Sequence, residues 1–230
     1  MAIKKQKNVG NRLLIFDFDG TLAGTFSAHY EAWGDALEAY DIKISFSLLK
    51  RLLKEGLDSE KIARSLGIEG KLIPVIVDKK SRAYSEIALK KASLYPYTKQ
   101  VIKTLYERGY VLCILTTVER KTVEKILSKY GLKKYFSSIV GREDIKYPKP
   151  HPQSIYLAFQ RLEEKLGNKA GVECFYIGDS KTDGALSKAV GIPFVWFLSP
   201  YQGKQKSLIG DNIKYVVAIK SLKELLNIFS

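Results

Sequence analysis

The chain has 230 residues, of which 46% are hydrophobic and 27% are charged, and its formal net charge is +14. This composition is typical of a soluble globular protein with one good core and room for a small second domain. No apolar run approaches the length of a membrane span, and the apolar run at residues 13–16 is too short for the core of a signal peptide. We therefore expect a cytoplasmic protein with no membrane partner.

The positive charge does not by itself define a partner. Most basic residues are lysines spread along the chain, with a denser group at Lys4, Lys5 and Lys7, and there is no arginine-rich tract. Nucleic acid is therefore the less favoured partner, and a positive field would also attract small phosphorylated molecules. The two cysteines, Cys113 and Cys174, each lie in an apolar run and are predicted to be core residues.

The first predicted strand, at residues 13–16, leads directly into two carboxylates, Asp17 and Asp19. Strand side chains alternate between faces, so both carboxylates project the same way. Gly20 follows, where the chain must turn sharply, and glycine tolerates the positive φ that such turns need. Two neighbouring carboxylates are costly to bury, which favours a cation or a reaction at this point. The alternative is a turn whose aspartates cap backbone amides.

The next block, residues 24–95, is predicted to be an all-helical insert. Apolar residues recur at helical spacing over about residues 28–39, around residues 48–53, from residue 58 to Gly67 and from about 71 to 94. Pro74 is tolerable in the first turn of the last helix, and no strand pattern interrupts the block. The remaining residues, 1–23 and 96–230, are assigned to the core.

From Pro96 onward, predicted helices and strands alternate. The helices are expected at about 98–109, 119–130, 153–166, after Asp179 to residue 189, and 222–229, with strands at 111–115, 138–140, 174–177, 193–197 and 214–217. Thr116 and Glu119 fit a capping box at the start of the second of these helices. The alternation predicts parallel βαβ units in an open α/β sheet. Ligands of such sheets bind beyond the carboxyl ends of the strands.

Three further polar motifs follow predicted strands or the loops after them. Thr116 comes directly after the strand at 111–115, where its hydroxyl could bind an anion or cap a helix. Lys149 lies among three prolines in residues 147–152. The prolines could hold it in place as a cation of the site; the alternative is a solvated loop lysine. Asp179 and Asp183 follow the strand at 174–177; a helix N-cap would explain the first acid but not the second.

Together with residues 17–22, read Asp-Phe-Asp-Gly-Thr-Leu, these motifs resemble the haloacid dehalogenase-like (HAD) phosphohydrolases of the phosphoglycolate phosphatase and β-phosphoglucomutase type. The resemblance implies a Rossmann-like parallel-sheet core, the HAD fold, with a helical cap inserted after the first strand. It implies that Asp17 is the nucleophile, Asp19 the general acid and base, and that Thr116 and Lys149 act at the phosphoryl group. Gly20 and Thr117 would join them in binding phosphate. A Mg²⁺ ion would bind the Asp17 carboxylate, the Asp19 backbone carbonyl and Asp179, with Asp183 as a ligand or just behind it.

The activity implied by the resemblance is Mg²⁺-dependent hydrolysis of a small phosphorylated metabolite, of phosphoglycolate or sugar-phosphate type, through an aspartyl-phosphate intermediate. Haloacid dehalogenases lack the second acid, so the presence of Asp19 argues against dehalogenation. A phosphosugar mutase is the alternative, but the cap loop at residues 56–59 lacks the arginine usual in such mutases. A basic protein that binds nucleic acid or an acidic partner on the same scaffold also remains possible. Oligomeric state cannot be read from the sequence.

Two positions near the first motif bear on the cap. The family motif commonly continues as Leu-x-Asp-Ser. In this chain Leu22 and Ala23 are followed by Gly24 and Thr25 instead. This departure affects cap geometry and substrate preference but not the core chemistry. His29 lies in the predicted hinge, where we expect a polar residue without a catalytic role.

Overall fold

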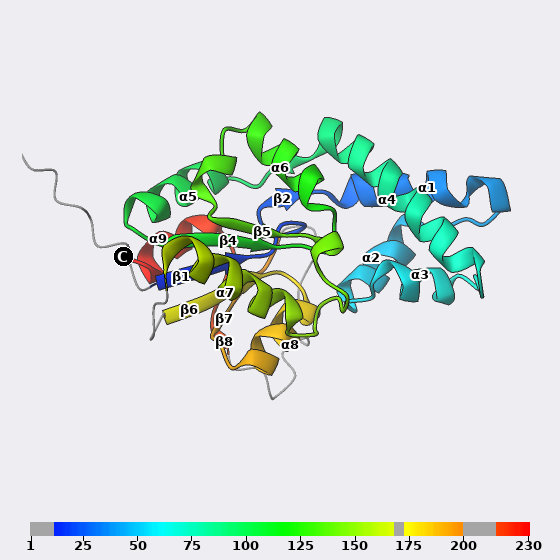
Figure 1. Cartoon of the computed structure of the whole chain (residues 1–230). Coiled ribbons are helices and arrows are strands. Elements are labelled where there is room, and N and C mark those ends of the chain that lie inside the picture. The colour runs from blue at the N-terminus through cyan, green and yellow to red at the C-terminus, as the bar shows by residue number, and fades with distance from the viewer. Residues whose placement is uncertain (1–11, 168–172, 200–214) are drawn as a thin grey trace, which may run out of the picture.

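The computed structural model describes residues 12–167, 173–199 and 215–230 of the chain. Its central sheet is built around β1 (Arg12–Phe16), an apolar strand whose last four residues are buried. Six parallel strands lie in the order β5-β4-β1-β6-β7-β8 (Figure 1). The other five are β4 (Val111–Leu115), β5 (Ser138–Val140), β6 (Glu173–Gly178), β7 (Phe194–Phe197) and β8 (Tyr215–Ile219). Residue 214, expected at the start of the last strand, lies outside the described residues, as do Lys4, Lys5 and Lys7.

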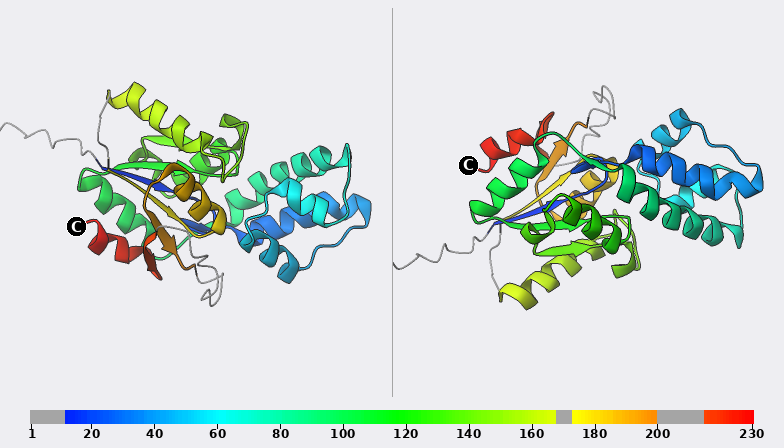
Figure 2. Two further views of the ribbon diagram at one scale, coloured as in Figure 1. Left: turned by 90° about the horizontal axis from the view of Figure 1, so that it is seen from below. Right: turned by 90° about the horizontal axis from the view of Figure 1, so that it is seen from above.

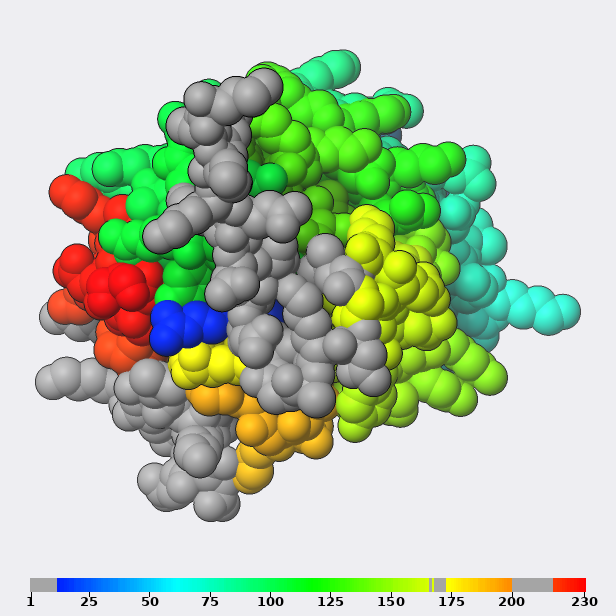
Figure 3. Space-filling model, turned by 60° about the vertical axis from the view of Figure 1, so that its left-hand side comes forward, coloured from blue at the N-terminus to red at the C-terminus, as the bar shows by residue number. Residues whose placement is uncertain are grey.

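Alternate residues of β1 face two separate apolar cores. Leu14 and Phe16 pack with α5 (Thr98–Glu107), α6 (Arg120–Lys129) and α9 (Leu225–Ile228). Leu13 and Ile15 pack with α7 (Gln153–Leu166) and α8 (Lys181–Val190). The expected parallel α/β sheet is confirmed, and helices cover both of its faces. The C-terminal segment, red in Figure 3, lies beside the start of β1, blue, away from the helical insert.

Cys113 and Cys174 are buried free thiols in the second of these cores, as predicted. Burial raises the pKa of each thiol to about 12. Both thiols are therefore packed, un-ionised side chains at neutral pH.

The insert forms a helical cap at the carboxyl ends of the strands (Figure 2). It consists of α1 (Phe26–Leu37), α2 (Phe46–Lys54), α3 (Ser59–Ser65) and α4 (Leu72–Lys91). The cap has its own apolar core, which includes Trp33, Leu49, Ile62 and Ile76. Ser45 and Asp58 cap α2 and α3 by accepting a backbone N–H, the pattern expected at helix starts. The helical cap is therefore confirmed, whereas its limits at residues 24 and 95 remain a prediction.

The structure corrects the last turn of the predicted fourth helix. The helix ends at Lys91, and Ser93–Leu94 forms β3, which pairs antiparallel with β2 (Ala23–Gly24). The two passages of the chain between core and cap run side by side here, so backbone pairing replaces the helical bonds. Tyr95 also precedes Pro96, and a residue before proline favours an extended conformation.

Two local expectations around α5 and α6 were wrong. The N-cap of α6 is Glu119, and no side chain caps it. The Thr116 hydroxyl accepts instead from the backbone N–H of Val118, 3.2 Å away, because Thr116 still belongs to the strand end. The spacing of apolar residues in the helix expected at about 98–109 also places Tyr106 on the same face as Val101, but Val101 is buried and Tyr106 is 49% exposed.

Among the described residues, no helix combines the length and the apolar character needed to cross a membrane.

Candidate active site

The two carboxylates of the first motif lie at the carboxyl end of β1, as the strand pattern predicts. Asp17 follows β1 directly and is 5% exposed. Gly20 has a φ of +86°, and a Cβ placed on it would lie 2.2 Å from Asp179 Oδ2. Gly20 is therefore required in the turn after β1 for two reasons: its positive φ and the close approach of Asp179.

Lys149 joins the first motif to the last. Its Nζ donates to Asp17 Oδ1 and to Asp183 Oδ1, each at 2.7 Å, and all three side chains are buried. Burial opposes the charged ammonium, but the two carboxylates outweigh it and hold the pKa of Lys149 well above its ordinary value. The lysine predicted from the proline-rich loop is thus a permanently charged partner of Asp17.

Tyr176 is a residue of the candidate site that the sequence reasoning missed. Its hydroxyl donates to Asp183 Oδ1 at 3.0 Å and lies 3.3 Å from Lys149 Nζ, which can donate to it. Tyr176 lies in β6 and is fully buried. The sequence feature that could have indicated Tyr176 is its hydroxyl, the only one in the apolar strand predicted at residues 174–177. Gly178 also lies against Asp183: an added Cβ would be 2.6 Å from that residue's Cβ.

Three carboxylates form a compact group that could hold a metal ion. One oxygen of each of Asp17, Asp179 and Asp183 lies within 4.8 Å of the others. Burial, followed by neighbouring charges, raises the pKa of Asp17 to about 7 and raises that of Asp179 well above its ordinary value. This excess of buried negative charge is what a divalent cation relieves, and an all-oxygen donor set suits Mg²⁺.

Asp183 and Asp19 are the aspartates of the site whose carboxylate oxygens are less suited to bind a metal ion. Asp183 Oδ1 is engaged by Lys149 and Tyr176, and its Oδ2 accepts from Ser180 Oγ at 2.6 Å. The Asp19 carboxylate lies outside the group of three, and the ligand expected from Asp19 was its backbone carbonyl. The donor set therefore fits Mg²⁺ best through Asp17 and Asp179.

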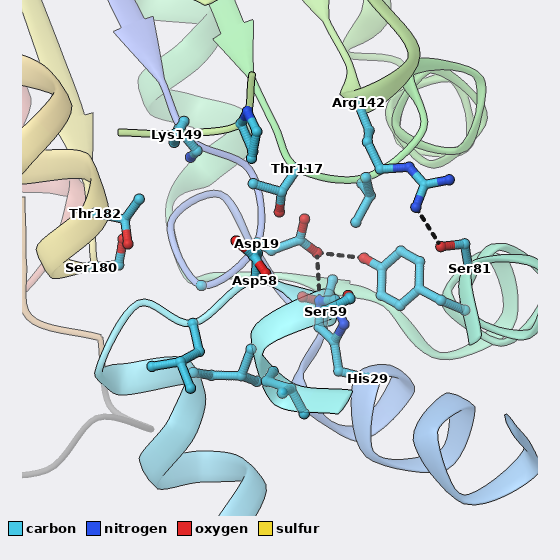
Figure 4. A pocket seen from close by; sticks show the side chains of 18 of the residues that line it. Asp19, His29, Asp58, Ser59, Ser81, Thr117, Arg142, Lys149, Ser180 and Thr182 are labelled. Atoms are coloured by element: carbon cyan, nitrogen blue, oxygen red, sulfur yellow. Dashed lines mark hydrogen bonds and ion pairs between the residues drawn. The ribbon is translucent and has the colours of Figure 1, made fainter. Parts of the chain in front are cut away.

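Asp19 is surrounded by hydroxyl and imidazole groups rather than by lysine. Tyr84 donates to its Oδ1 through a short hydrogen bond, and Thr116 Oγ1 donates to its Oδ2 at 3.3 Å. His29 Nε2 lies 3.6 Å from Oδ1 (Figure 4). Burial alone would raise the pKa of Asp19, but His29 and the hydrogen bonds from Thr25 and Tyr84 lower it to about 2. Asp19 is therefore ionised at rest.

These groups open into a cavity of about 800 Å³ between core and cap. The core contributes most of the predicted residues to its lining, namely Asp17, Asp19, Gly20, Thr117, Lys149, Asp179 and Asp183. Thr116 does not line the cavity and lies behind Asp19 as its hydrogen-bond donor. The cap contributes His29, Lys80 and Tyr84, of which the sequence indicated only His29, and that as a hinge residue. Sequence reasoning could not find the other two, because they lie on a helix far from every motif.

The sequence and structure comparisons agree on one family. A model of the haloacid dehalogenase-like hydrolases matches residues 14–197. A phosphoglycolate phosphatase of Haemophilus influenzae is 26% identical over 200 residues, covering 82% of this chain and 86% of that protein. One from Shigella boydii is 31% identical over 114 residues, covering 50% of this chain and 43% of that protein.

Solved structures share the whole fold. A protein described as a haloacid dehalogenase-like hydrolase from Bacteroides fragilis has a TM-score of 0.77 at 25% identity, with 93% of this chain and 98% of that chain covered. CbbY from Rhodobacter sphaeroides, solved in complex with phosphate, has a TM-score of 0.76 at 21% identity, with 93% and 96% covered. The chain therefore belongs to the haloacid dehalogenase-like hydrolases. Within that family it is an enzyme of the phosphohydrolase class.

Proposed function

We propose that this protein hydrolyses the phosphomonoester of a small metabolite, of phosphoglycolate or sugar-phosphate type, with Mg²⁺ and through a phosphorylated Asp17. The observation that carries the proposal is the pairing of Asp17 Oδ1 with Lys149 Nζ at 2.7 Å, with Asp19 on the same cavity. A buried carboxylate held by one cation, beside a second carboxylate of very different pKa, is the arrangement expected of a nucleophile and an acid–base group.

In the first step, an oxygen of Asp17 attacks phosphorus, and the bond from phosphorus to the leaving oxygen breaks. Lys149 holds the carboxylate in place and offsets the negative charge that collects there. Asp19 gives a proton to the leaving oxygen, so that an alcohol departs. Asp19 first takes up that proton when the phosphate dianion binds beside it and raises its pKa from the resting value of about 2.

In the second step, water attacks the phosphorus of phospho-Asp17. Asp19, now a carboxylate, takes the proton of that water, and the bond between phosphorus and Asp17 breaks. Tyr84, Thr116 and His29 hold the Asp19 carboxylate between the two steps. Inorganic phosphate leaves, Asp19 releases to solvent the proton that it took from the water, and both aspartates return to their resting state.

Asp17 and Asp179 would hold the Mg²⁺ ion, with the backbone carbonyl of Asp19. When bound, the ion supplies positive charge that lowers the repulsion between the aspartates and the phosphate. The all-oxygen donor set and the raised pKa values of Asp17 and Asp179 support this assignment.

We propose that residues 24–95 act as a cap that closes the site to bulk water. Thr182 Oγ1 of α8 donates to the backbone carbonyl of Gly56 in the cap at 3.1 Å. On the opposite flank, Arg142 donates to Ser81 Oγ at 3.1 Å. Contacts on both sides of the cavity support a closed arrangement, which excludes water from the first step and disfavours polymeric substrates.

The test is hydrolysis of p-nitrophenyl phosphate with and without Mg²⁺, by wild type, Asp17→Asn and the control Asp35→Asn, an exposed carboxylate of α1. We expect turnover that needs Mg²⁺, that is lost in Asp17→Asn and that is unchanged in the control. Absence of turnover in wild type with Mg²⁺ would contradict the proposal. In that event, conversion of β-glucose 1-phosphate to glucose 6-phosphate would indicate a mutase, and salt-sensitive binding of DNA or RNA a binding protein.

A further inference from the structure

Lys80 is a buried cation that forms no ion pair with any carboxylate in the described part of the chain. It lies in α4 four residues from both Ile76 and Tyr84, on the face that packs inward, and is only 5% exposed. Among the described residues, no carboxylate lies within 4.0 Å of its Nζ. An ammonium group in such a place is costly unless something offsets its charge.

The described residues provide only some of the hydrogen-bond acceptors that the Lys80 ammonium group can use. Nζ donates to His29 Nδ1 at 3.0 Å and lies 5.1 Å from the centre of the Tyr84 ring. The ammonium has three hydrogens, and the described residues provide an acceptor for one of them. Burial lowers the pKa of Lys80 to about 8; the charge of Asp19 opposes this shift and the charge of Arg142 adds to it, so Lys80 is mostly charged at neutral pH.

Arg142 is the second cation on this wall of the cavity. It begins the short 3-10 turn after β5, and its guanidinium donates to Ser81, the residue next to Lys80 (Figure 4). Among the described ion pairs none involves Arg142, since Asp144 binds Arg161 and Arg120. Two of the acids that also line the cavity carry their own partners: Asp58 pairs with Lys61, and Asp78 with Arg82.

The pair lies on the Asp19 side of the cavity. His29 bridges the two groups: its Nδ1 accepts from Lys80, and its Nε2 lies 3.6 Å from Asp19 Oδ1. Lys149, by contrast, binds Asp17 and Asp183. In the proposed mechanism Asp19 faces the leaving oxygen, so the part of the substrate nearest Lys80 and Arg142 is the departing alcohol.

We infer that Lys80 and Arg142 form a second anion site, which binds a carboxylate or a second phosphate on the leaving group of the substrate. This inference rests on the proposed function, because it places the substrate by the role of Asp19. The substrate is then a phosphomonoester with an anion at both ends, and a cavity of about 800 Å³ can hold both. An anion here would fill the acceptor positions left open around Lys80 and offset its buried charge.

The test compares substrates that differ only in the second anion. Values of kcat/KM are measured for 2-phosphoglycolate against ethyl phosphate, and for propane-1,3-diol bisphosphate against 3-hydroxypropyl phosphate. We expect wild type to prefer at least one charged substrate by a hundredfold or more. The first pair reports a carboxylate site and the second a phosphate site.

Variants show whether the two cations cause that preference. Lys80→Met and Arg142→Gln should each reduce the ratio of charged to neutral substrate at least tenfold. Lys79→Met removes an exposed lysine beside Lys80 and should leave the ratio and both rates unchanged. A structural role of Lys80 would lower kcat/KM for both substrates equally and leave the ratio intact.

Three results separate failure of the inference from failure of the proposed function. Hydrolysis of the neutral esters with ratios near one would overturn the second anion site and leave the phosphatase standing. A wild-type preference that survives in both variants would also overturn it. Absence of hydrolysis for every ester would overturn the proposed function itself.

Discussion

Asp17 is a carboxylate that this fold makes costly to ionise. It is buried at the end of β1, and burial followed by neighbouring charges raises its pKa to about 7 although Lys149 pulls it down. In the proposed mechanism Asp17 must be ionised to attack phosphorus, so it would depend on the cation beside it and on the metal proposed for the site. Asp19, two residues away, has a pKa of about 2 because its neighbours donate hydrogen bonds to it. The two acids therefore suit different tasks.

Replacing Tyr176 by phenylalanine tests whether its hydroxyl positions Lys149 and Asp183. The change removes two hydrogen bonds in a buried site but no charge. A loss of about 1 kcal/mol of transition-state stabilisation would lower kcat about fivefold, with KM little changed. The control is Tyr156→Phe, since Tyr156 is 59% exposed. Unchanged kcat in Tyr176→Phe, measured on folded protein, would argue against a positioning role.

Lys80→Met should make the protein more stable while it loses substrate selectivity. The pKa of Lys80 falls from 10.5 to about 8 on folding, so the folded state disfavours the charge. That cost is fully present below pH 8 and disappears as the pH rises above 10.5. We expect the variant to gain about 1 to 3 kcal/mol in free energy of unfolding at pH 7, since the lost bond to His29 offsets part of the gain.

Urea unfolding of Lys80→Met at pH 7 and at pH 10.5 measures this difference, with Lys79→Met as the control. The stability gain should be present at pH 7 and shrink at the higher pH. A variant less stable than wild type at pH 7 would mean that Lys80 is held by more favourable contacts than those described.

At the scale of elements, the loop between α2 and α3 connects the cap to α8 of the core through the hydrogen bond from Thr182 to Gly56. Gly56 has a φ of +80°, and a Cβ placed on it would lie 2.2 Å from Thr182 Oγ1. Gly67, at the end of α3, has a φ of +81° and nothing within 4 Å of such a Cβ. The two glycines therefore share the same backbone conformation, which would strain any other residue, but they differ in the contact with α8.

Gly56→Ala and Gly67→Ala form a matched pair that isolates cap closure. Each should lose about 1 kcal/mol of stability from the positive φ. Only Gly56→Ala should also displace the Thr182 hydroxyl and break its hydrogen bond to the cap, and steady-state kinetics should show its kcat/KM reduced tenfold or more while Gly67→Ala stays within twofold of wild type. Equal kinetics in the two variants would mean that this contact does not matter for catalysis.

The sequence predicted elements well wherever a local pattern defined them. The apolar strand before Asp17, the helical spacing of the cap and the alternation after Pro96 each depend on neighbouring residues, and the structure confirms them. It could not reveal β3, because Ser93–Leu94 is extended only through its pairing with β2, which lies about seventy positions earlier in the chain. The same limit explains the wrong capping box: Thr116 is drawn to Asp19 and not to the start of α6.

The candidate site divides in the same way. Residues from the core motifs could be named beforehand, since each follows a strand whose end lies at one edge of the sheet. Tyr176, Tyr84 and Lys80 could not, because their roles depend on which groups the packed cap and core bring within hydrogen-bond distance. The motifs therefore predict the proposed chemistry, whereas the proposed selectivity depends on contacts between cap and core that no motif shows.

For the whole molecule, the proposed metal site predicts a link between Mg²⁺ and stability. A ligand that binds only the folded state at a hundred times its Kd adds about 2.7 kcal/mol, and this would raise the Tm of a chain of this size by about 5 to 10 °C. Thermal unfolding of EDTA-treated protein, with and without Mg²⁺, measures the shift. Asp179→Asn should abolish it and Asp35→Asn should keep it. A Tm of wild type that does not respond to Mg²⁺ would contradict the site.

The most direct measurement is detection of the phosphoryl group on Asp17. Wild type is mixed with excess phosphomonoester and Mg²⁺, quenched in acid within milliseconds, digested and examined by mass spectrometry. The account predicts that the peptide containing Asp17 gains the mass of one phosphoryl group, that Asp19→Asn accumulates more of it, and that Asp17→Asn shows none. Rapid phosphate release without any phosphorylated peptide, in both wild type and Asp19→Asn, would contradict covalent catalysis by Asp17.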